Sequence, residues 1–183
     1  MGLRRPRESR SSKSTTTAIS KQKPIKTIDI EIAVAKYFDP RKNIIVPNIS
    51  WGLGLHECDL LIIRPKTGYA LEVEIKISKS DLKADAKKKH THSSTKIREF
   101  YYAIPINLLD SCLEYIPEHA GILTCERNMY DGIVVSQFRS PKINTKARKL
   151  DEKEILKASH LGCMRIMPLK IKIVALQDKI LKQ

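Results

Sequence analysis

A β-hairpin between residues 58 and 77 is the feature that most constrains how this chain can fold. Its two segments, Cys58–Arg64 and Tyr69–Ile77, are the strongest strand signals in the sequence, and only the loop Pro65–Gly68 separates them. Proline presets φ and glycine admits positive φ, so this loop favours a turn between antiparallel strands. The turn pairs Arg64 with Tyr69, and this pairing sets the register of the whole hairpin.

The register of the hairpin gathers its acidic residues on one side of the sheet. Counting from the turn, Leu61 lies opposite Glu72 and Asp59 lies opposite Glu74. Because side chains alternate along a strand, Lys76 lies on the same side as these acids. We expect the other side to be an apolar layer that forms the core, made of Leu60, Ile62, Leu71, Val73 and Ile75.

Carboxylates gathered on one side of a hairpin repel one another unless something neutralises them. A divalent cation would do so, and carboxylate oxygens suit Mg²⁺ or Mn²⁺ rather than a softer metal. The alternative is an ordinary solvated face on which Lys76 alone balances the acids. The hairpin residues leave both interpretations open.

The remaining elements predict an α/β fold, with a mixed β-sheet flanked by helices. Helical spacing predicts a helix over Thr27–Phe38, capped by Thr27, and a second helix over Ser78–His90. From about Asp151 onwards we expect basic helices, interrupted at Gly162 and Pro168. Shorter signals predict strands at Asn43–Ile49, Glu99–Ile104, Ala120–Cys125 and Gly132–Phe138, and a short helix over Asn107–Tyr115.

The positive charge of the chain is concentrated at its two ends. The formal net charge is +14, of which residues 1–26 and 141–183 contribute +7 each, while residues 27–140 sum to zero. Cationic ends on a neutral body indicate a polyanionic partner, most commonly nucleic acid; the alternative is that they only keep the protein in solution. We expect a disordered basic tail at 1–23, an α/β domain at 24–140, and a basic helical C-terminal extension that packs on the domain.

Membrane and secretion signals are missing from the sequence. No stretch approaches about 18 consecutive apolar residues, and no apolar segment follows the basic start Met1–Arg7. We therefore expect an intracellular, cytoplasmic protein without a membrane partner. A homodimer is left open.

The spacing of Asp59 and Glu74-Ile75-Lys76 resembles the signature of the PD-(D/E)XK nuclease superfamily, whose members share a restriction-endonuclease-like core. The resemblance implies that Asp59 and Glu74 ligate Mg²⁺ or Mn²⁺. It implies that the backbone carbonyl of Ile75 joins them and that Lys76 orients or activates the attacking water. It also implies a further catalytic acid on the preceding helix, which Glu31 matches.

The same resemblance extends over about residues 27–138, in the order helix, strands, helix, strand. The sequence is also similar to small bacterial and phage proteins of the MmcB-like DNA-repair type. Cys58 departs from the signature, because a proline commonly precedes the aspartate. Glu72 is a candidate acid behind the metal ligands. In such proteins the helix after the hairpin often directs basic or polar residues to phosphate, which Lys83 and Lys87 match. Lys88, His90 and His92, at the end of the predicted helix, are further candidates for phosphate contact; the alternative is that the two histidines are solvated surface residues.

These features together predict a Mg²⁺-dependent nuclease that hydrolyses DNA phosphodiester bonds in DNA repair, recombination or phage biology. Lys76 acts as a base only if its pKa is depressed, and otherwise it stabilises developing charge. The alternative function is a catalytically inactive DNA-binding module of the same fold. A scaffold whose basic ends bind RNA or protein is a third interpretation.

Overall fold

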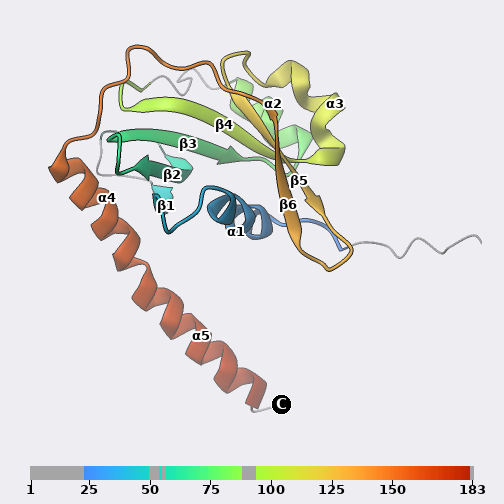
Figure 1. Ribbon diagram of the computed structural model, residues 1–183. Coiled ribbons are helices and arrows are strands. Elements are labelled where there is room, and N and C mark those ends of the chain that lie inside the picture. Colours follow the sequence, from blue (N-terminus) through green and yellow to red (C-terminus); the bar gives the residue numbers. More distant parts are fainter. Residues whose placement is uncertain (1–22, 50–53, 55–56, 88–93, 182–183) are drawn as a thin grey trace, which may run out of the picture.

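The computed structural model describes residues 23–49, 54, 57–87 and 94–181. In this part of the chain, six strands form one mixed sheet, in which their order matches their order in the sequence (Figure 1). Neighbouring strands are antiparallel, except that the fourth is parallel to both the third and the fifth. The strands are β1 (Ile44–Ile49), β2 (Cys58–Arg64), β3 (Tyr69–Ile75), β4 (Ile97–Pro105), β5 (Gly121–Arg127) and β6 (Ile133–Arg139).

Helices cover both faces of the sheet, which confirms the predicted α/β class with a mixed sheet flanked by helices. One face is covered by α1 (Thr27–Tyr37). The opposite face is covered by α2 (Lys79–Ala86), α3 (Leu109–Cys112) and α4 (Glu152–Met164). Short 3₁₀ turns at Ile106–Leu108 and Leu113–Tyr115 flank α3, and α5 (Ile166–Leu181) follows α4.

The β2–β3 hairpin has the predicted register. Arg64 lies opposite Tyr69, Leu61 opposite Glu72, and the paired positions end at Leu60. Asp59 therefore lies one position beyond the paired region, at the end of the hairpin away from the turn. The prediction is correct for the paired positions, because the turn residues and the alternation of side chains are local properties. The predicted pair of Asp59 with Glu74 is not among them.

The predicted apolar layer of the hairpin is buried beneath α1, where Leu60 and Val73 contact Ile30 and Val34 in one cluster. The acidic side of the hairpin is buried as well, contrary to the alternative of a solvated face. Glu72 is fully buried and Glu74 is only 5% exposed. The sheet is covered on this side because apolar residues of β2, β4 and three helices form two further clusters there, including Leu61, Ile63, Phe100, Tyr102, Leu82, Cys112 and Ala158.

Several predicted boundaries shift by a few residues. The N-cap of α1 is Lys26 rather than Thr27. In α2, the Ser78 hydroxyl accepts a hydrogen bond from the Asp81 backbone N–H at 3.2 Å, so Ser78 is the N-cap. The helix ends at Ala86 rather than His90, which lies outside the described residues. Such ends depend on tertiary contacts that periodicity alone does not carry.

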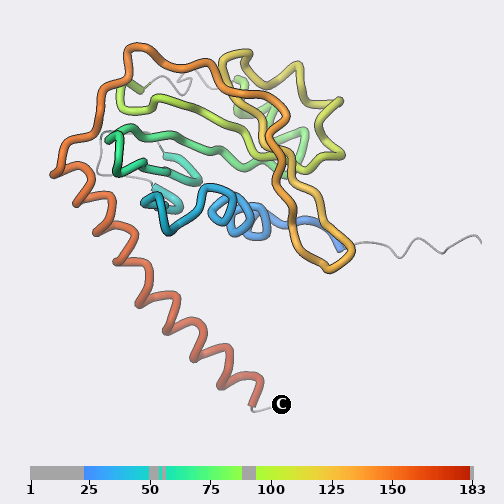
Figure 2. The backbone as a smooth tube through the Cα atoms, in the orientation of Figure 1, coloured from blue at the N-terminus to red at the C-terminus, as the bar shows by residue number. Residues whose placement is uncertain are grey.

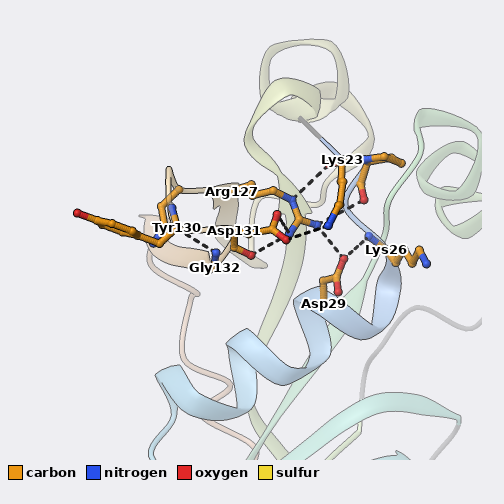
Figure 3. Close-up of polar contacts among 9 residues, drawn as sticks. Lys23, Lys26, Asp29, Arg127, Tyr130, Asp131 and Gly132 are labelled. Atoms are coloured by element: carbon orange, nitrogen blue, oxygen red, sulfur yellow. Dashed lines mark hydrogen bonds and ion pairs between the residues drawn. The ribbon is translucent and has the colours of Figure 1, made fainter. Parts of the chain in front are cut away.

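A single arginine fastens the start of α1 to the β5–β6 hairpin (Figure 3). The Arg127 side chain is 9% exposed, and one of its terminal nitrogens donates to the Asp29 carboxylate at 3.0 Å. The other donates to the carboxylate and the backbone carbonyl of Asp131, both at 2.9 Å. Its Nε donates to the backbone carbonyl of Lys23 at 3.2 Å. Arg127 thus ties the first turn of α1 to residues about a hundred positions away.

An extended segment after β6 runs back across the start of β4 and leads into α4 (Figure 2). Its backbone donates to four carbonyls of the described body: Lys142 to His119 at 2.8 Å, Asn144 to Arg98 at 2.9 Å, Arg148 to Thr95 at 2.8 Å, and Leu150 to Gly68 at 2.8 Å. α4 then packs beside β1, with Ala158 fully buried. This part of the C-terminal segment thus packs against the sheet.

The predicted packing of the C-terminal extension on the domain does not include its last helix. α5 projects away from the body, and none of its residues is buried (Figures 1 and 2). The helical path breaks at Arg165, close to Pro168, which has no N–H to donate to the carbonyl of Met164. The other predicted break, Gly162, does not interrupt the helix and lies inside α4. A Cβ atom at position 162 would lie 3.8 Å from the Val46 side chain of β1. None of the described helices has the length and apolar character needed to cross a membrane.

Glu154 holds the first turn of α4 to the body through hydrogen bonds and ion pairs. Its replacement should remove a contribution to the free energy of unfolding that depends on pH. Hydrogen bonds from Arg148 lead the interactions that lower the pKa of Glu154 to about 2, and Lys96 contributes from 2.9 Å. The folded-state pKa lies below the ordinary value of 4.5, so this contribution is present above pH 4.5 and is lost as the pH falls towards 2.

We expect Glu154→Gln to lower the free energy of unfolding at pH 7 by about 1–2 kcal/mol, after discounting for the exposure of Arg148. The difference from the parent should shrink as the pH falls below 4.5, as measured by urea unfolding over a pH series. Glu152→Gln, in the same helical turn and exposed, is the control. A constant difference across that range would contradict the assignment.

Candidate active site

The candidate site lies at the carboxyl end of β3, where the strand ends and the chain turns towards α2. Glu74 and Ile75 are the last residues of β3, and Lys76 follows directly. The Lys76 ammonium lies 2.8 Å from the Glu74 carboxylate. The carboxylate of Asp59 accepts a hydrogen bond from the backbone N–H of Ile75 at 2.7 Å. The hairpin thus brings Asp59, Glu74 and Lys76 to one strand end.

Asp85, which the sequence analysis did not select, contacts the same lysine. Its carboxylate lies 3.5 Å from the Lys76 ammonium and accepts a hydrogen bond from the Tyr102 hydroxyl at 2.6 Å. Asp85 is buried although it lies on a short, mostly exposed helix. It follows Leu82, the apolar anchor of α2, by three residues, so helical spacing alone could have placed it on the buried face.

Glu31 approaches the site from the opposite face of the hairpin strands, on α1. The Asn48 side chain lies 3.5 Å from its carboxylate. The pKa of Glu31 is raised, first by burial and then by the charge of Asp59, although Asn48 opposes the shift. Glu31 and Asp59 are therefore close enough to interact electrostatically.

Burial and like charge make the Glu74 carboxylate costly to ionise. Its pKa is raised chiefly by burial, and the charges of Asp59 and Glu72 add to the shift, while Lys76 opposes it. Glu72 lies two residues earlier on β3 and is fully buried between neighbouring strands. Three carboxylates therefore repel one another here, and a cation bound among them would relieve that repulsion.

The environment of Lys76 favours its charged form. Burial on its own lowers the pKa of Lys76, but the carboxylates of Glu74, Asp85 and Asp59 outweigh it, so the net shift is upward. Of the two roles that the sequence left open, an ammonium that stabilises negative charge fits this geometry better than a neutral base.

A pocket of about 290 Å³ opens beside the lysine and gives the site access to ligand. It lies between the start of α1 and the first turns of α2. Asp59, Lys76 and Asp85 reach its wall, together with Thr27, Ile75, Ile77, Asp81 and Ala84. Glu31 and Glu74 do not line this pocket, so it adjoins the acidic cluster rather than containing all of it.

The predicted phosphate-contacting residues are only partly described. Lys83 is exposed on α2, and Lys87, the C-cap of that helix, is exposed as well. The Lys83 ammonium lies 5.2 Å from the centre of the Tyr115 ring, on the side of the helix that faces α3. Neither lysine lines the pocket. Lys88, His90 and His92 lie outside the described residues.

The oxygen atoms at this strand end suit a hard divalent cation. Asp59 and Glu74 would supply carboxylate oxygens and Ile75 a backbone carbonyl, and Mg²⁺ is commonly held by one or two carboxylates with water completing its shell. Within the described residues, no group of three or more His, Cys, Asp or Glu side chains is arranged to hold a metal ion. Any such ion would therefore rely on two carboxylates and a carbonyl rather than on a closed cage of side chains.

Comparisons with known proteins return no match: no family model matches the chain, and neither does any curated protein or solved structure. The resemblance to PD-(D/E)XK nucleases therefore stays a prediction.

Proposed function

We propose that this protein is a Mg²⁺- or Mn²⁺-dependent nuclease with a restriction-endonuclease-like core that hydrolyses DNA phosphodiester bonds. The observation that carries the proposal is the meeting of Asp59, Glu74 and Lys76 at one strand end beside an open pocket. The order of elements agrees with the resemblance: a helix, three antiparallel strands, a helix, and a strand parallel to the third.

Each residue of the site has a role that suits phosphodiester hydrolysis. Asp59, Glu74 and the carbonyl of Ile75 would hold the cation. When bound, that ion would neutralise phosphate oxygens and lower the pKa of its water. Lys76 would stabilise the charge that develops on the phosphate, and Asp85 with Tyr102 would keep the lysine in place. Glu31, half-buried and near Asp59, would accept a proton or orient water.

DNA is the substrate that the charge distribution supports. A phosphodiester backbone is a polyanion, and the two cationic ends of the chain would bind it without sequence preference. The site then needs only to position one phosphate against the acidic cluster.

The test is to incubate the full chain with supercoiled, linear and branched DNA, with Mg²⁺, with Mn²⁺ or with a chelator. We expect cleavage with either metal and none with the chelator. If DNA binding weakens with salt but no substrate is cut with either metal, the inactive DNA-binding module becomes the better description.

A further inference from the structure

The exposed surface of α5 is unusually apolar for a helix that nothing in the described chain covers. The helix spans 16 residues and has no buried residue. Helices of this length are marginal in water when they stand alone. Nine of its apolar side chains are at least 49% exposed, namely Ile166, Met167, Leu169, Ile171, Ile173, Val174, Leu176, Ile180 and Leu181.

Five of these side chains form a narrow stripe with the spacing of a coiled coil. They follow one another in steps of three and four residues: Ile166, Leu169, Ile173, Leu176 and Ile180. In a seven-residue repeat lettered a to g, the isoleucines occupy a and the leucines occupy d. A strict a/d stripe is the seam of a coiled coil, narrower than the face by which a helix packs on a globular core.

The identity of the seam residues indicates a second copy of the same helix. β-branched isoleucine at a, with leucine at d, favours two parallel strands over three or four. The seam is complementary to itself, because each a layer would set isoleucine against isoleucine and each d layer leucine against leucine.

The charges beside the seam indicate the same orientation. In a parallel pair, Lys172 at g faces the uncharged Gln177 at e of the other helix, so this contact carries no repulsion. In an antiparallel pair, g faces g, and Lys172 would meet Lys179. Arg165, the preceding g residue, donates to the backbone carbonyls of Pro47 and Asn48 on the edge strand β1 and is therefore held away from the seam.

We propose that α5 pairs in parallel with α5 of a second copy of this chain, forming a short two-stranded coiled coil that makes the protein a homodimer. Parallel pairing places both globular bodies at the same end of the coil. Because the seam has only five layers, we expect association of about micromolar strength.

The proposal is tested by measuring the molar mass of the full chain, freed of nucleic acid. The mass is measured by analytical ultracentrifugation at a series of protein concentrations. We expect a shift from 20.9 kDa towards twice that mass. Ile173→Lys, at the seam, should weaken association at least about tenfold. Ile171→Lys makes the same change on the opposite side of the helix and should leave association intact. Both positions are exposed, 54% and 65%, so neither change should disturb the folded body.

The dependence of association on salt distinguishes pairing with a second copy from binding of α5 to a different partner. Lysines flank both helices of the proposed pair, so raising the salt concentration should strengthen the dimer. Binding to an acidic helix of another protein, or to anionic vesicles, would weaken with salt. A chain that stays monomeric well above micromolar concentration, or that associates only with such vesicles, would overturn the proposal.

Orientation is tested with a single cysteine. In a Cys163→Ser background, Ile180→Cys places one thiol at an a position near the end of α5, while the other cysteines are buried. A parallel pair brings the two thiols together, and mild oxidation should give a covalent dimer. An antiparallel pair would set the a position 180 against the d position 169 of the other helix, far from its residue 180, so a dimer that resists this crosslink would refute the parallel arrangement.

Discussion

Glu74→Gln is expected to lower metal-dependent DNA cleavage by at least about a thousandfold. The substitution keeps the size of the side chain and an oxygen that can accept from Lys76, 2.8 Å away, but removes the charge proposed to hold the cation. Asp59→Asn should have a similar effect, because asparagine retains an oxygen for the Ile75 N–H and loses only the charge. The measurement is the rate of plasmid nicking at saturating Mg²⁺.

Two controls distinguish loss of chemistry from loss of structure or of contaminating activity. Glu126→Gln removes an exposed carboxylate from β5 and should leave cleavage unchanged. Salt-dependent DNA binding and the circular dichroism spectrum should be the same in all three variants. If Glu74→Gln and Asp59→Asn both cut DNA at the parental rate, the assigned site is wrong, whatever the source of the activity.

Arg127→Met is expected to lower the free energy of unfolding by about 2–4 kcal/mol. Methionine replaces the aliphatic part of the side chain but none of its donors. Asp29, Asp131 and the carbonyl of Lys23 would lose their bonds to a side chain that is 9% exposed (Figure 3). Guanidinium chloride unfolding measures the effect. Arg41→Met, at an exposed turn after α1, is the matched control and should change stability by less than about 0.5 kcal/mol.

A second measurement, the pKa of Asp29, shows whether the loss of stability in Arg127→Met arises at the start of α1. The pKa of Asp29 is held below its ordinary value first by the Lys26 N–H and then by Arg127. In Arg127→Met this pKa should rise, which NMR titration of the carboxyl would detect. A large loss of stability with no change in the Asp29 titration would mean that Arg127 acts elsewhere, through the β5–β6 hairpin alone.

The sequence by itself determined the register of the hairpin over its paired residues, and with it the side on which Glu72 lies. The turn at Pro65–Gly68 and the alternation of side chains are local, so the pairing of Leu61 with Glu72 could be counted before any tertiary contact was known. The same local signals predicted the six strands. β1 lies at the edge of the sheet, where the missing N–H of Pro47 costs no bond to a further strand.

Only the tertiary structure decided what surrounds those acids. Glu72 is buried because β4 lies parallel beside β3, and the helices α2, α3 and α4 cover that face. Asp85 and Tyr102 meet Lys76 across elements separated by turns and strands. Such contacts depend on how whole elements pack, and packing sums many weak non-local interactions that no single segment encodes. The strand pattern therefore predicted which of the paired residues share a face, and the packing of β4 and the distant helices decided that this face is buried.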